Sequence, residues 1–131
     1  MTLFSKIIKG EIPSFKIAEN EFFYAFLDIF PLRAGHTLVV PKIEEDRFFD
    51  LPASSLSQIL IFAQPIARAI EAAFPCDRVG ISVIGLEVPH AHLHLVPIDD
   101  ADDLNFTRAK IKIDNDGLYV AQQKILDHLK I

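Results

Sequence analysis

At residues 89–97 the chain reads Pro89-His90-Ala91-His92-Leu93-His94-Leu95-Val96-Pro97. Three of the five histidines alternate there with apolar residues. Successive side chains of a β-strand point to opposite faces, so the three imidazoles would share one face and Ala91, Leu93 and Leu95 would point the other way, into a core. On a helix they would be turned by about 100° per residue and could not converge. The segment therefore predicts a strand over residues 88–97 that carries a row of imidazoles.

A row of imidazoles supports several kinds of chemistry. A ring nitrogen can attack phosphorus or carbon, transfer a proton near neutral pH, or bind a metal ion. Two neighbouring histidines on a strand make a good zinc pair, and His36, at the head of another expected strand, would supply a further ligand. A solvated sheet face without a function is the third interpretation. From the pattern alone, nucleophilic and metal-dependent chemistry both stay open.

Four more short strands are expected, because apolar, aromatic and β-branched runs are bounded by turn residues at 15–18, 22–27, 36–40 and 78–84. The turn-like Glu19-Asn20-Glu21 joins the first two runs into a β-hairpin. Strands that meet through short turns favour an antiparallel sheet. Helices packed on such a sheet make an α+β domain.

Helical segments are expected at three places. A short amphipathic helix covers residues 4–9, and a closing helix covers 118–129. Between them apolar residues recur at helical spacing after Ser54 or Ser55, either of which can cap a long helix. Pro65 lies inside that pattern and should kink the helix or displace its start. Residues 46–51 are expected to form a helical turn.

Composition narrows the class of protein. The chain has 131 residues, half of them apolar and 24% charged, as in a globular domain. A net charge of −5 argues against a nucleic-acid polymer as partner, because such binding needs clustered Lys and Arg. Cys76 is the only cysteine, so no internal disulfide is expected. No apolar run suggests a signal peptide or a membrane span, and we therefore expect a cytoplasmic protein.

The segment His90–Val96 resembles the signature of the histidine triad (HIT) family, in which three alternating histidines precede apolar residues. Three further segments resemble the blocks of that family in the same order: Phe4–Pro13, Ala25–Pro31 and Gly35–Lys42. The resemblance covers about residues 4–97, leaves 98–131 as a C-terminal extension, and is closest to the Hint-like branch. It implies one HIT domain over 1–131, with a five-stranded antiparallel sheet, a long helix and a shorter C-terminal helix. It also implies a homodimer with a ten-stranded sheet.

The resemblance implies a reaction as well. His92, the middle histidine, would attack the α-phosphorus of a nucleotide and form a nucleotidyl-histidine intermediate, which water then hydrolyses. His90 and His94 would orient His92 and donate hydrogen bonds to phosphate oxygens, with His36 joining the same relay. The implied activity is that of a nucleoside phosphoramidase-like hydrolase, acting on a purine nucleotide or a nucleoside 5′-phosphoramidate. No cofactor is expected.

The family's binding positions can be assigned one by one to this sequence. Asp28 would hold the ribose hydroxyls. Glu87 would lie near the leaving group, and a solvated loop carboxylate is the equal alternative for that residue. The base would lie in an apolar cleft between the opening helix and the hairpin, at Phe4, Ile7, Phe26, Ile29 and Leu38.

The sequence also departs from the family pattern. Thr2 and Ser5 stand where many members have two cysteines that help to bind structural zinc, so no metal is expected. The loop before the triad is short, and Leu86 replaces an amide that normally contacts the phosphate or leaving group. A catalytically weak nucleotide-binding or scaffolding protein is therefore the first alternative, and a metal-dependent enzyme that uses the histidine row is the second.

Overall fold

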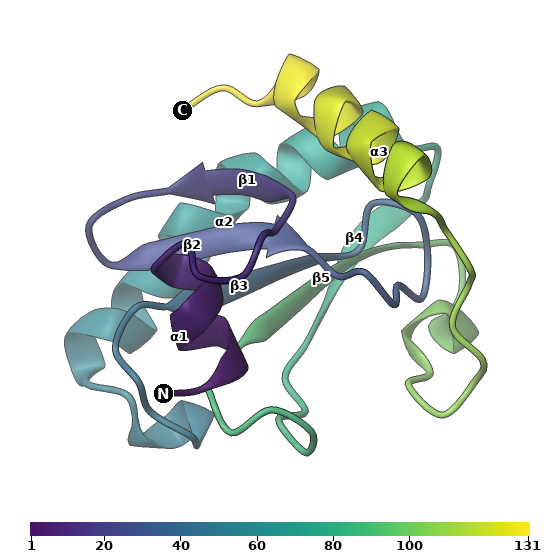
Figure 1. Ribbon diagram of the computed structural model, residues 1–131. Helices are drawn as coiled ribbons and strands as arrows, with labels where there is room; N and C mark the ends of the chain where they lie inside the picture. Colours follow the sequence, from purple (N-terminus) through teal and green to yellow (C-terminus); the bar gives the residue numbers. More distant parts are fainter.

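Five strands form one antiparallel sheet in the order β1-β2-β3-β5-β4, as expected from the short turns (Figure 1). The computed structural model describes residues 1–131. The strands are β1 (Lys16–Glu19), β2 (Phe23–Leu27), β3 (Thr37–Pro41), β4 (Arg78–Ser82) and β5 (Leu93–Ile98). The predicted α+β class with a five-stranded antiparallel sheet is confirmed.

Helices cover both faces of this sheet (Figure 1). In that view α1 lies in front of the sheet, whereas α2 lies behind it with α3 packed against α2. The helices are α1 (Leu3–Ile8), α2 (Ala53–Ala73) and α3 (Asn115–His128), with the 3₁₀ turns η1 (Phe48–Asp50) and η2 (Ala101–Leu104). No helix is long and apolar enough to cross a membrane.

The alternation of side chains in the strands divides the core in two. Phe23, Ala25 and Leu27 of β2 point into a large cluster under α2 and α3. Tyr24 and Phe26 point into a smaller cluster under α1. Because both faces are covered, every residue of β2 is buried. The smaller cluster adjoins the functional site.

The hairpin between β1 and β2 forms as predicted. The side-chain oxygen Oδ1 of Asn20 accepts hydrogen bonds from the backbone N–H groups of Phe22 and Phe23, at 2.9 and 2.8 Å. An Asn side chain that bonds to backbone ahead of it favours a turn over a continued strand. The two strands then pair in antiparallel register.

The long helix begins earlier than the expected cap. Pro52 is the N-cap residue, and the first helical hydrogen bond runs from the Leu56 N–H to the Pro52 carbonyl, at 3.0 Å. The prediction of Ser54 or Ser55 as the cap is therefore wrong. Pro65 does not displace the start either, since α2 continues through it from Ala53 to Ala73.

The strand predicted over residues 88–97 is shorter than expected. β5 begins at Leu93, so His94 is on the strand while His90 and His92 precede it. β4 ends there, since His94 pairs with Ser82, the last residue of β4. β3 continues past Val39, the partner of Leu93, to Pro41. The prediction that three imidazoles form a regular row on one strand is therefore wrong, although the three side chains remain close together.

Candidate active site

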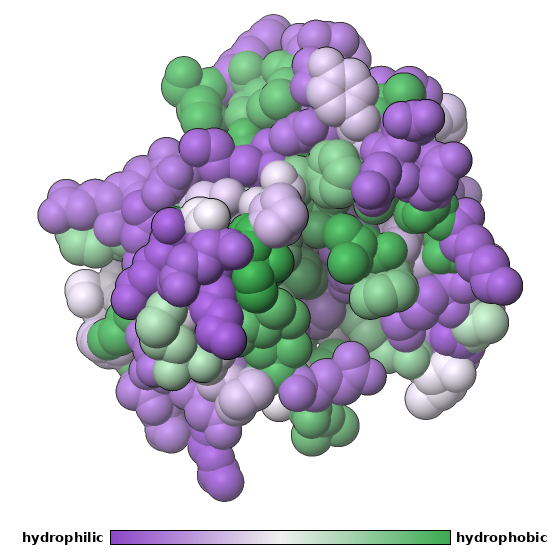
Figure 2. All heavy atoms as spheres, viewed as in Figure 1, coloured by the Kyte–Doolittle hydropathy of each residue, from purple (hydrophilic) through white to green (hydrophobic).

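The four predicted site histidines gather on the α1 side of the sheet. The ring centroids of His92 and His94 are 4.9 Å apart, and those of His36 and His94 are 5.2 Å apart. Phe4 of α1 lies against His90 and His92, with centroid distances of 5.9 and 5.0 Å. On this face the surface is hollowed beside α1, and mostly apolar side chains surround the hollow (Figure 2).

His92 is held in the tautomer that a nucleophile needs. Its Nδ1 lies 2.7 Å from the backbone carbonyl oxygen of His90. A carbonyl only accepts, so Nδ1 carries the proton and donates it. The lone pair is therefore on Nε2, which has no partner in the protein. Since no fully buried side-chain nitrogen or oxygen lacks a partner, this Nε2 is open to solvent and to a ligand.

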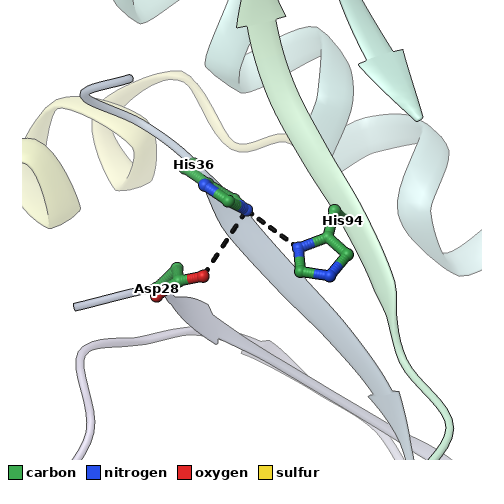
Figure 3. Close-up of side chains that lie close together, drawn as sticks. All are labelled: Asp28, His36 and His94. Carbon is green, nitrogen blue, oxygen red and sulfur yellow. Dashed lines mark hydrogen bonds and ion pairs between the residues drawn. The ribbon is translucent and has the colours of Figure 1, made fainter. Parts of the chain in front are cut away.

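His36 and His94 form a directed pair (Figure 3). The backbone N–H of Leu32 donates to Nδ1 of His36 at 3.0 Å, so the proton of His36 is on Nε2. That Nε2–H donates to Nδ1 of His94 at 2.9 Å. His94 must then carry its own proton on Nε2, on the side away from His36. The pair presents an N–H donor to the hollow beside the lone pair of His92.

His90 acts differently from the expectation. Its Nε2–H donates to the carbonyl of Pro41 at 2.8 Å, and its Nδ1 accepts from the hydroxyl of Thr2 at 2.7 Å. Both ring nitrogens are occupied, so neither can donate to a phosphate in this arrangement. What His90 contributes is its backbone carbonyl, which fixes the tautomer of His92.

A polar cluster at the N-terminus holds His90 in turn. Thr2 caps α1, because its Oγ1 accepts a hydrogen bond from the Ser5 N–H. The Thr2 hydroxyl in turn donates a hydrogen bond to Nδ1 of His90. Glu44 accepts from the Thr2 N–H at 2.8 Å and from the Ser5 hydroxyl. Thr2 and Ser5, the positions where a metal-binding pair was considered, are thus used in hydrogen bonds.

Burial keeps the imidazoles neutral. It lowers the pKa of His36 to about 3, and that of His94 to about 3. It lowers the pKa of His92 as well, while the hydrogen bond to the His90 carbonyl opposes that shift. At pH 7 the site therefore holds uncharged rings, as the donor–acceptor order of their hydrogen bonds requires.

Asp28 lies at the end of the His36–His94 pair (Figure 3). Its Oδ1 accepts from the Phe30 N–H at 2.9 Å, and its Oδ2 is 3.6 Å from Nε2 of His36. Burial raises the pKa of Asp28 to about 6, against the lowering effects of the Phe30 hydrogen bond and of the Lys110 charge. The carboxylate is 20% exposed, so a ligand hydroxyl can reach it.

The same three side chains also form a set of candidate metal ligands. One ligand atom from each of Asp28, His36 and His94 lies within 4.8 Å of the others. In the observed arrangement, however, Nε2 of His36 donates a hydrogen bond to Nδ1 of His94. A metal ion would have to displace that proton and break the hydrogen bond.

The apolar residues predicted to hold a base are gathered in part. Four of them lie in the smaller core cluster under α1: Phe4, Ile7, Phe26 and Leu38. Ile29 does not join them, because its side chain is 51% exposed in the loop after β2. Glu87 is exposed in the loop before the triad, and its charge acts on the pKa of both His92 and Asp28. The loop carboxylate is thus near the site.

Sequence reasoning missed residues from the C-terminal extension. The ring of Phe106 lies edge-on to His94, with centroids 4.7 Å apart, and 6.1 Å from His36. Lys110 lies further along the same irregular segment, and its ammonium group lies over the Phe106 ring. No periodicity or motif in this irregular segment marks these two residues, so nothing in the sequence pattern identified them.

Fold and site together define an α+β protein in which the unpaired Nε2 of one imidazole lies close to a hydrogen-bonded pair of imidazoles. The sequence profile of the HIT domain family matches residues 9–101. The chain therefore belongs to the HIT domain family, as the resemblance implied.

Several known proteins are similar to this chain. The adenosine 5′-monophosphoramidase HNT1 of Saccharomyces cerevisiae is 40% identical over 103 residues, which cover 75% of this chain but only 63% of that protein. An uncharacterized HIT-like protein of Methanocaldococcus jannaschii is 37% identical, over 78% of this chain and 82% of its own length. The crystal structure of a Hit-like protein involved in cell-cycle regulation from Bartonella henselae superposes with a TM-score of 0.85, at 29% identity, covering 98% of this chain and 96% of that one.

Proposed function

We propose that the protein hydrolyses nucleoside 5′-phosphoramidates, or related derivatives of the α-phosphate, through a covalent adduct on His92. One observation carries this proposal. The His90 carbonyl holds the proton of His92 on Nδ1, so the Nε2 lone pair is available to attack phosphorus. The phosphoramidase name of the similar yeast protein supports the choice of leaving group.

The reaction proceeds in two displacements. In the first, a bond forms between Nε2 of His92 and the α-phosphorus, and the bond from phosphorus to the leaving nitrogen breaks. That nitrogen takes a proton from water or from Glu87 and departs as an amine or ammonia. In the second, water adds to phosphorus, the bond to Nε2 breaks, and the nucleoside monophosphate leaves with a proton released to solvent. Two easier steps replace one difficult step.

The surrounding residues support a nucleotide as substrate. The Nε2–H of His94 is a preorganised donor for a phosphate oxygen, and one such donor contributes about 3 kcal/mol to catalysis in known enzymes. Asp28 would accept hydrogen bonds from ribose hydroxyls. An apolar wall of Phe4 and Phe26 suits the flat face of a purine, with ring centroids 5.5 Å apart.

The test is hydrolysis of adenosine 5′-phosphoramidate, followed as release of AMP. Replacing His92 with Asn should lower kcat by at least about 10³-fold, since loss of a nucleophile costs more than loss of one donor. His128→Asn is the matched control, because this histidine is exposed on α3. An acid-quenched reaction should show one nucleotidyl group on the wild-type protein by mass spectrometry and none on His92→Asn. Turnover by His92→Asn would contradict the proposal.

Two other functions remain as alternatives, each with its own observation. The loop before the triad exposes Leu86 and carries no buried polar side chain for a leaving group, which favours a nucleotide-binding protein with little turnover. Calorimetry would then show AMP binding without hydrolysis. The Asp28–His36–His94 set favours metal-dependent chemistry, which predicts a bound metal in elemental analysis and loss of activity with chelator.

We also propose that two copies pair through β4. This strand is at one edge of the sheet, and Ile81 on it is 52% exposed. Ile81 faces the α2 side, as its register partner Leu95 does, and α2 exposes Leu60 and Ile61. An unpaired edge flanked by apolar side chains is typical of a surface that is covered in an assembly. A cytoplasmic location likewise stays a prediction, to be tested by cell fractionation.

A further inference from the structure

A segment of the C-terminal extension closes one side of the His36–His94 pair. This segment, residues 105–111, is called the strap below. Phe106 of the strap lies edge-on to both imidazoles, at 4.7 Å from His94 and 6.1 Å from His36 between ring centroids. An apolar ring in this position excludes water from the hydrogen bond between them. The strap is therefore part of the wall of the site.

The strap is tied to the loop that carries Asp28 and His36. Arg108 Nη2 donates to the Leu32 carbonyl at 2.9 Å, and the Ile111 N–H donates to the Pro31 carbonyl at 3.0 Å. Arg108 also reaches the carboxylates of Asp102 and Asp103 in η2. These bonds fix the strap at its middle, through Arg108, and at its C-terminal end, through Ile111, so Lys110 between them has a defined position.

Lys110 is a cation held in this wall without a carboxylate partner. Its Nζ donates to the Phe106 carbonyl at 2.9 Å and lies 5.5 Å from the centre of the Phe106 ring. Arg33 and Lys42, by contrast, are paired with Asp103 and Glu19. An ammonium group has three N–H donors, and only one of them is used here. Two donors remain for a ligand.

The site otherwise lacks positive charge. Burial lowers the pKa of His36, His92 and His94, which favours their uncharged forms. Among the lysines and arginines, Lys110 is the one whose charge affects the pKa values of Asp28, His36 and His94. A phosphate group carries one or two negative charges, and charge-assisted hydrogen bonds to it are stronger than neutral ones.

We propose that Lys110 binds the phosphate of the substrate beside His94, and that Phe106 holds the lysine there while it shields the His36–His94 pair. This inference rests on the proposed function, because it takes the ligand to be a nucleotide. The phosphate would then be bound by two groups, the Nε2–H of His94 and the ammonium group of Lys110 from the strap.

Binding measurements can test the role of Lys110 apart from catalysis. The probes are AMP and adenosine, which differ only in the phosphate, titrated calorimetrically into the full chain. Lys110→Met keeps the length of the side chain and removes its charge. It should weaken AMP binding by at least about tenfold, the usual effect of losing a charge-assisted hydrogen bond, and leave adenosine binding unchanged. Lys110→Arg should retain most of the AMP affinity. Lys112→Met is the matched control, an exposed lysine two residues away.

The outcomes separate this inference from the proposed function. Unchanged AMP affinity in Lys110→Met would overturn the role of Lys110 and leave the nucleotide site standing. An equal loss for AMP and adenosine would also overturn it, because the lysine would then act on the ribose through Asp28 or on the fold. Failure of the wild-type protein to bind either probe would remove the nucleotide site and the inference together.

Discussion

At the level of single side chains, the site is an ordered set of hydrogen-bonded imidazoles. Each histidine gives at least one ring nitrogen to the protein, and that bond determines what its other nitrogen can do. The carbonyl of His90 leaves the lone pair of His92 on Nε2, whereas the N–H of Leu32, acting through His36, leaves the proton of His94 on its Nε2. Neutral rings suit this task, because protonation of His92 would remove the lone pair that attacks.

The pH dependence of kcat/KM should be set by Asp28. In the proposed complex its carboxylate form would accept hydrogen bonds from ribose hydroxyls, and burial raises its pKa to about 6. We expect kcat/KM to rise with pH through about 6 and then to level off, because the free enzyme's ionisations appear in this parameter. His36 and His94, whose pKa values are about 3, should not contribute between pH 5 and 8.

The measurement is kcat/KM for adenosine 5′-phosphoramidate at intervals between pH 5 and 8. Asp28→Asn should lower the rate and abolish the rise near pH 6. Asp127→Asn, at an exposed position on α3, should leave the profile unchanged. A profile with the same rise in Asp28→Asn would assign it to another group.

The Thr2 hydroxyl should stabilise the fold through His90. Thr2→Val keeps the shape of the side chain but leaves the buried Nδ1 of His90 without a donor. An unsatisfied buried polar atom costs about 1–3 kcal/mol, so the free energy of unfolding in urea should fall by about that amount. Thr2→Ser keeps the hydroxyl and should stay close to wild type. Equal stability of Thr2→Val and wild type would show that the bond contributes little.

Among the elements, the strands were the most predictable, because their side chains alternate between two buried faces. The hairpin and β3 follow from runs such as Phe23–Leu27 and Thr37–Pro41. The start of β5 was not predictable, because it depends on where β4 ends and on where the chain before Leu93 makes its hydrogen bonds. The Ala91 N–H donates to the Glu45 carbonyl at 2.7 Å, away from the sheet ladder. No local pattern encodes that contact between distant segments.

The candidate site, like the strands, was predictable only in part. The four histidines could be named because their type and spacing carry chemistry, and Asp28 could be named because its segment resembles a block of the HIT family. Thr2 takes part through a hydrogen bond to His90 that spans most of the chain. Phe106 and Lys110 lie in an irregular segment, where no sequence pattern marks their contacts with the site. The family resemblance implied that Ile29 lines the base pocket, but the side chain is 51% exposed in the loop after β2.

Gly35 should be essential to the loop that delivers His36. Its φ of +98° is strained for any residue with a side chain, and an added Cβ would lie 2.8 Å from the Phe74 ring. Gly35→Ala should therefore lower the free energy of unfolding by about 1–2 kcal/mol for the backbone alone, and further for the clash. Urea denaturation checks this. In the Phe74→Leu background the clash is relieved, so Gly35→Ala should cost less there; an equal cost would mean that Phe74 is not the obstacle.

For the molecule as a whole, the exposed edge of the sheet predicts self-association. Ile81→Lys places a charge in the middle of the exposed β4 surface, where it would be buried without a partner in a dimer. We expect the wild-type protein to sediment as a dimer and Ile81→Lys to sediment as a monomer at the same concentration. Val120→Lys, on the exposed face of α3, should remain dimeric. A wild-type monomer at all concentrations would remove the proposed pairing.

Two contacts of the triad come from residues outside the range that the family profile matches. A fragment trimmed to 9–101 would keep all four imidazoles. It would nevertheless lose the hydroxyl that fixes His90 and the aromatic cover over His94. A chimera that exchanged only residues 9–101 between relatives would carry over the four imidazoles without the Thr2 hydroxyl and the Phe106 ring. Divergence at the two chain ends would therefore let related proteins adjust reactivity while the triad itself stays the same.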